Sequence, residues 1–215
     1  MLTQAQKLIS DNQPVAAVAL LTQILAANPN DKPALSLRAV TLVQMGQTKE
    51  AIADVEALIQ LDPTQLACSL LRADILAIDG QTENAIAAYH SILAQKPEAG
   101  NVVLRLGNLL QQAKRWEEAL TIYSNAIETL PDFAEAYMAR GAVKHHLKDL
   151  AGAAEDLKQA LTLKPELAEQ FEGSVATIVT PHGNTIPLEP VSLLRAPFLS
   201  LHMNLYLPPS GDPSS

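Results

Sequence analysis

Proline placement is the feature that most constrains what this chain can fold into. The sequence is rich in alanine and leucine, which favour helices, yet its 215 residues include 14 prolines, which break helix interiors. Five prolines recur at a fixed interval of 34 residues, and this period indicates stacked helix–turn–helix units. These five are Pro29, Pro63, Pro97, Pro131 and Pro165.

Two other positions recur with the same period. An alanine occupies one of them, where a small side chain lets two crossing helices approach closely. The other lies between the two helices of a unit and holds Asn12, Gly46 and Gly80, which tolerate a positive φ. Lys114 and Lys148 follow at this position, so we expect a strained or differently shaped turn there. The recurrent alanines are Ala17, Ala51, Ala85, Ala119 and Ala153.

The repeated pattern resembles the tetratricopeptide-repeat family over about residues 1–173. The best match runs from Ala134-Glu135-Ala136-Tyr137 through Gly141 and Ala153 to Pro165, whereas the first unit is partial. The resemblance implies an all-α fold, a right-handed superhelical α-solenoid of antiparallel helix pairs with a short C-terminal β or irregular tail. The expected units are 1–31, 32–65, 66–99, 100–133 and 134–167, then a truncated capping helix 168–173, a β-strand-containing tail 174–207 and a disordered end 208–215.

The resemblance also implies where partners bind, because the first helix of each pair lines the concave face in this family. We expect a groove that is apolar in its first half and polar in its second. Chaperone-binding members clamp a C-terminal carboxylate with five residues, but here two residues of one unit stand at clamp-like positions, so we do not expect that activity. A solvated groove wall is the alternative for the polar half. The implied partner-binding residues are Leu37, Val40, Leu70, Leu71, Asp74, Ile78, Arg105, Asn108, Gln112 and His145.

The tail after the repeats has a different pattern. Ser174 to Thr180 and Thr185 to Leu188 flank a turn signal, which predicts a hairpin. A later segment alternates apolar and polar residues and predicts an amphipathic strand. This strand has three possible fates: folding back on its own helices, pairing with a second copy, or docking on another protein. Its apolar residues, the candidates for association, are Leu199, Leu201, Met203, Leu205 and Leu207.

No pattern of residues indicates catalysis or a bound metal. Phosphate loops, nucleophile elbows and paired-histidine zinc helices are not visible in the sequence. His145 and His146 are adjacent and point about 100° apart on a helix, so a surface pair is the preferred interpretation. The single cysteine, Cys68, excludes a disulfide framework and is expected to be packed. A repeated arginine (Arg38, Arg72 and Arg140) predicts a repeated contact with a neighbouring helix.

These observations predict a non-enzymatic protein-interaction scaffold or adaptor that binds a partner peptide or helix in its groove and needs no cofactor. The alternative is a structural subunit or homo-oligomer assembled through the alternating strand. A net charge of −8 argues against nucleic-acid binding. No apolar run reaches the roughly 18 residues of a membrane span and no export signal is visible, so we expect a cytoplasmic protein.

Overall fold

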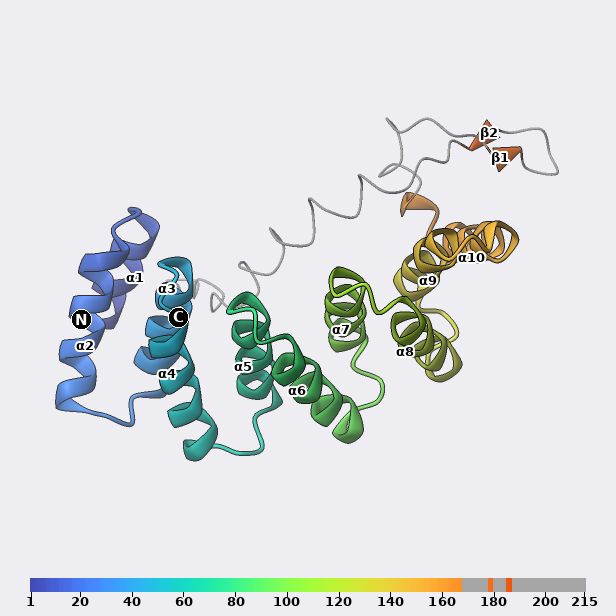
Figure 1. The fold of residues 1–215 in the computed structure, drawn as a ribbon. Coiled ribbons are helices and arrows are strands. Elements are labelled where there is room, and N and C mark those ends of the chain that lie inside the picture. Colours follow the sequence, from blue (N-terminus) through green and yellow to red (C-terminus); the bar gives the residue numbers. More distant parts are fainter. Residues whose placement is uncertain (168–177, 180–184, 187–215) are drawn as a thin grey trace, which may run out of the picture. The chain divides into compact units, whose positions relative to one another are not determined.

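The computed structural model describes residues 1–167, 178–179 and 185–186. Within them the chain forms ten α-helices and one pair of short strands, divided between two compact units, Met1–Lys96 and Pro97–Ser215 (Figure 1). The first unit contains α1 (Leu2–Ser10), α2 (Pro14–Ala27), α3 (Lys32–Gln44), α4 (Thr48–Leu61), α5 (Leu66–Ile78) and α6 (Thr82–Gln95). The second contains α7 (Gly100–Gln112), α8 (Trp116–Thr129), α9 (Ala134–His146) and α10 (Leu150–Leu163).

The helices form five pairs, so the predicted all-α repeat fold is confirmed. In each unit, every helix packs on the next one along the chain, within a pair and between consecutive pairs. Each periodic proline stands two residues after the end of a second helix, as Pro29 does after α2 and Pro63 after α4. Four of these prolines therefore lie in the connections between pairs, where a missing N–H costs no helical hydrogen bond, and Pro165 begins the turn after the last pair.

The turns inside the five pairs share one backbone conformation. The residue at the recurrent turn position has φ between 57° and 77° in every pair. The next residue donates its N–H to the carbonyl five residues back, as in Gln13 to Leu8 (2.8 Å) and Arg115 to Leu110 (2.8 Å), which is the closing bond of a Schellman motif. Lys114 (φ 60°) and Lys148 (φ 70°) adopt the same left-handed conformation as Gly46. The expectation of a differently shaped turn at the two lysines is therefore wrong.

Small residues at the helix crossings bring the pairs together. Four of the five recurrent alanines have no exposed surface, and the fifth, Ala153, is half-buried. Around them the first unit packs a core cluster that includes Leu21, Leu37 and Leu58. In the second unit Tyr123 is the largest side chain with no exposure. The four fully buried alanines are Ala17, Ala51, Ala85 and Ala119.

The last pair is followed by a single 3₁₀ turn at residues 165–167. Its Leu167 is buried against Ala134 and Ala160, so this turn closes the end of α9 and α10. Farther on, β1 (Ile178–Val179) pairs antiparallel with β2 (Thr185–Ile186), with Ile178 opposite Ile186. The predicted capping helix 168–173, the alternating strand 199–207 and the end 208–215 lie outside the described residues.

Candidate partner-binding faces

The predicted groove residues of the first unit differ in solvent exposure, and so in how accessible they are to a partner. Leu37, Val40 and Leu71 are only 7%, 8% and 6% exposed. Leu70 and Asp74 are half-buried, and Ile78, the last residue of α5, is 59% exposed. The exposed part of this predicted surface therefore lies at the C-terminal end of α5.

Repeat position explains the burial. The position of Leu37 is occupied by Leu71, Arg105 and Ala139 in the following repeats, and all four side chains are buried. Leu37 belongs to the core cluster of the first unit. An apolar residue at this position therefore packs inside its own compact unit and stabilises its helix pair.

Asp74 and Asn108 occupy equivalent positions, 34 residues apart, and both hydrogen-bond to a tyrosine of their own second helix. The Tyr89 hydroxyl donates to Asp74 Oδ1 at 2.7 Å. The Tyr123 hydroxyl donates to Asn108 Oδ1 at 3.3 Å and accepts from Gln111 Nε2 at 3.0 Å. Burial raises the pKa of Tyr123, so its hydroxyl stays protonated and available as a donor. These contacts give both residues a structural role within their repeat.

The last residue of each first helix is exposed in four successive repeats. We call these residues the first-helix ends: in the first unit they are Gln44 and Ile78, which end α3 and α5, and in the second unit Gln112 and His146, which end α7 and α9. Two of the predicted groove residues, Ile78 in the first unit and Gln112 in the second, belong to this set. His145, also predicted, is half-buried beside the exposed His146.

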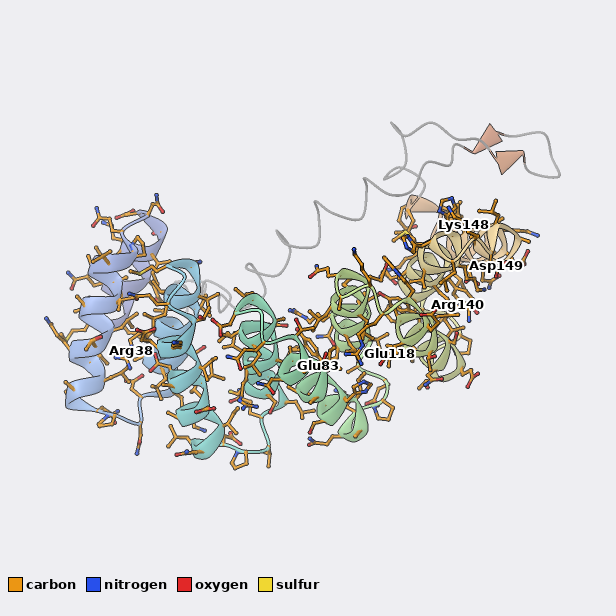
Figure 2. All side chains as sticks on the ribbon, in the orientation of Figure 1. Arg38, Glu83, Glu118, Arg140, Lys148 and Asp149 are labelled. Carbon is orange, nitrogen blue, oxygen red and sulfur yellow. The ribbon has the colours of Figure 1, made fainter. Side chains whose placement is uncertain are left out.

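The recurrent arginines join neighbouring pairs, as the sequence predicted. Arg38 donates through Nε and Nη2 to both carboxylate oxygens of Asp54 (2.8 and 2.6 Å) and through Nη1 to Thr22 Oγ1 (3.1 Å). Arg38 therefore links α3 to the second helix of its own pair and to that of the preceding pair (Figure 2). The hydrogen bond to Asp54 raises the pKa of the guanidinium.

Arg140 repeats this arrangement in the second unit. It donates to both oxygens of Asp156 (2.8 and 2.7 Å) and to Ser124 Oγ (3.3 Å). Lys144 adds a second cation 2.9 Å from the Asp156 carboxylate, which is itself 4% exposed. The buried carboxylate is therefore compensated by two cations.

An aromatic contact that the sequence did not reveal joins α8 to α9. The rings of Trp116 and His146 stack with centroids 3.7 Å apart and an interplanar angle of 27°. The two residues are 30 positions apart, a spacing that carries no signal of its own. This stack gives His146 a packing partner at the end of α9.

Cys68 is buried in the core cluster of the first unit. Burial raises the pKa of its thiol, and Sγ donates to Gln65 Oε1 at 3.3 Å. The part of the chain with described side chains has no group of three His, Cys, Asp or Glu residues placed to hold a metal ion. None of the described helices is both long and apolar enough to span a membrane.

Known proteins with the same architecture are repeat proteins. Family models described as "Tetratricopeptide repeat" match residues 8–75, 76–143 and 134–167. No curated protein is similar enough in sequence to count as a relative.

Solved structures share the fold at low sequence identity. A MamA crystal structure is 20% identical with a TM-score of 0.64, covering 77% of this chain and 96% of MamA. MamA from Desulfovibrio magneticus RS-1 is 18% identical (TM-score 0.62), covering 76% and 93%. YrrB, a TPR protein with an unusual peptide-binding site, is 19% identical (TM-score 0.56), covering 75% and 84%. Repeats of this kind form a protein-interaction fold, and this chain belongs to the tetratricopeptide-repeat family.

Proposed function

We propose that the chain is a non-enzymatic adaptor that binds a peptide or helix of a partner protein at its exposed first-helix ends, with Ile78 as the apolar anchor in the first unit. The observation that carries the proposal is Ile78, a large apolar side chain 59% exposed at the end of α5. An exposed apolar anchor is what a peptide-binding surface requires. YrrB, which shares the fold, has a peptide-binding site. A cytoplasmic location stays a prediction.

Exposure also determines how the proposal is tested. Substituting Leu71 with a charged residue would place a charge in a buried position and unfold the repeat, so loss of binding would say nothing about the surface. Ile78→Asp changes an exposed residue instead. Ala87→Asp is the matched control, because Ala87 is exposed on the second helix α6 of the same repeat.

The experiment compares partners captured from native cells by the tagged wild-type chain and by these two variants. We expect Ile78→Asp to lose the partners that the wild type retains, with helicity unchanged by circular dichroism. Ala87→Asp should retain them. Equal capture by all three proteins would contradict the assignment of the partner surface to the first helices.

Assembly through the tail is a second candidate function, favoured by the alternation of leucine and polar residues in the sequence 199–207. Replacing Leu201 and Leu205 with lysine should reduce the mass measured by light scattering if this strand joins two copies. Replacing His202 and Asn204, on the opposite face of the expected strand, should leave the mass unchanged. An unchanged mass in the leucine variant would refute assembly through the strand.

A further inference from the structure

The recurrent arginine of the first helices has a different environment in the third repeat. In the second and fifth repeats an aspartate stands 16 residues after the arginine and receives two of its hydrogen bonds. Sixteen residues after Arg72 stands Ala88, which has no polar side chain. The third repeat therefore keeps the arginine but lacks the carboxylate that fixes it elsewhere.

Arg72 instead faces an acidic residue on the preceding second helix. Its Nε lies 3.5 Å from Glu56 Oε1, a longer contact than the 2.6–2.8 Å bonds of Arg38 with Asp54. The side chains of Arg72 and Glu56 are 40% and 50% exposed, whereas those of Arg38 and Asp54 are 22% and 5% exposed. A solvated pair of this kind contributes little and exchanges readily with another anion.

A recess of about 350 Å³ opens where the aspartate is missing. Residues of α4, α5 and α6 line it, Arg72 and Ala88 among them. Figure 1 shows these three helices in the first unit. Ser69 and Ser91 add hydroxyl groups, and Ile59 and Ile92 add apolar surface. The lining thus combines the Arg72 cation, its weakly held counter-ion Glu56 and hydrogen-bond donors with aliphatic side chains. A carboxylate carried on an apolar segment suits this lining once it displaces Glu56 from Arg72.

We propose that this recess binds a carboxylate side chain of a partner protein, one flanked by apolar residues. The carboxylate would take the place that Asp54 and Asp156 hold in their repeats and would pair with the Arg72 guanidinium. Glu56 is the internal competitor for the same cation.

This site is separate from the partner surface proposed above. Arg72 and Ile78 are six residues apart, so at about 100° per residue they lie about 120° apart around α5. The recess is lined by residues of α4, α5 and α6, and Ile78 is not among them. The two proposals can therefore fail independently.

The test uses the full chain and a defined probe, the peptide N-acetyl-Leu-Asp-Leu-amide, with the Asn-containing peptide as its control. The Nε–H resonance of Arg72, assigned by comparison with Arg72→Gln, is followed by NMR during titration. We expect a saturable shift with the Asp peptide and none with the Asn peptide. The Arg72→Gln variant should lose binding while keeping its helicity.

Two variants locate the site without removing the arginine. Ala88→Asp restores the internal carboxylate and should weaken peptide binding about tenfold or more, because the bidentate pair occupies the guanidinium. Glu56→Gln removes the competitor and should tighten binding. No saturable shift in the wild type, equal shifts with both peptides, or unchanged binding in Ala88→Asp would each overturn the proposal. Tighter binding of inorganic phosphate than of the Asp peptide would overturn the carboxylate assignment.

Discussion

Gly107 is the position at which adding one methyl group should disturb this fold most. Its equivalents in the second and third repeats are Ala39 and Ala73, both fully buried, so the position accepts alanine elsewhere. In the fourth repeat, however, a Cβ at Gly107 would lie 2.2 Å from Tyr123 Cζ and 2.3 Å from its hydroxyl oxygen. Gly107→Ala therefore forces the tyrosine ring to move.

The size of the effect follows from what the ring would lose. Ordinary carbon–carbon contacts lie at about 3.5–4.0 Å, so the ring must retreat by more than about 1 Å within a core where it has no exposure. Overpacking costs about 1–3 kcal/mol, and loss of the hydrogen bonds to Asn108 and Gln111 adds about 1 kcal/mol. Alanine recovers about 1 kcal/mol over glycine in a helix. We expect a net loss of about 1–3 kcal/mol.

Urea unfolding followed by Trp116 fluorescence measures this loss, since Trp116 is the chain's single tryptophan and starts α8 in the second unit. Gly141→Ala is the matched control, because its nearest contacts would be 3.2 Å to the Ala153 carbonyl oxygen and 3.3 Å to Asp156 Cβ. We expect this control to lose less than about 1 kcal/mol.

A double mutant identifies the cause. Leu157 occupies the position of Tyr123 in the last repeat, so Tyr123→Leu offers a smaller side chain that the repeat accepts. The double variant Gly107→Ala with Tyr123→Leu should lose less unfolding free energy than the two single variants together, by about 1 kcal/mol or more. A wild-type stability for Gly107→Ala, or strict additivity in the double mutant, would refute the reasoning.

Three further predictions concern the turns and the carboxylates. Lys114→Gly and Lys148→Gly should each raise the free energy of unfolding by about 0.5–1 kcal/mol. The left-handed conformation costs an L-residue about 1–2 kcal/mol, and the greater chain entropy that glycine loses on folding offsets part of this gain. Equal or lower stability in chemical denaturation would contradict this prediction. Asp156→Asn should cost about 3 kcal/mol, because it leaves two cations without their buried anion; a loss as small as that of an exposed aspartate would show that the pair contributes little. Hydrogen bonds from two side chains lower the pKa of Asp79, so its stabilising contribution is present above the unfolded-state pKa of about 3.9 and disappears as the pH falls through the lower native value. Asp79→Asn should therefore show a shallower loss of stability below about pH 4 in thermal melts, and an identical slope would contradict this assignment. The larger of the two effects on the Asp79 pKa comes from the Gln81 hydrogen bond and the smaller from the Thr48 hydrogen bond.

The helix pairs and some of their turns were predictable because these depend on local sequence. Proline cannot continue a helix, and the 34-residue period shows which prolines separate pairs. The Schellman turns were predictable at Gly46 and Gly80, where glycine favours the left-handed conformation. They were not predictable at Lys114 and Lys148, because there the closing hydrogen bonds impose a conformation that lysine disfavours.

The candidate site was less predictable, because helical periodicity does not separate a groove from a core. Leu37 and Leu71 lie on first helices and are apolar, as a groove anchor would be, yet each packs inside its repeat. The arginine contacts did have an unused signal, since an aspartate stands 16 residues after both Arg38 and Arg140. The stack of Trp116 on His146 had none, because it depends on how two consecutive pairs pack.

The central claim is that partners bind at the exposed first-helix ends, and site-specific photo-crosslinking in native cells tests it most directly. A photoreactive amino acid is placed at Ile78 or Gln112, and at Ala87 or Thr121 as equivalent, exposed positions on second helices. We predict that at least one first-helix position crosslinks to a partner protein that neither second-helix position captures. Crosslinks confined to the second helices would contradict the claim.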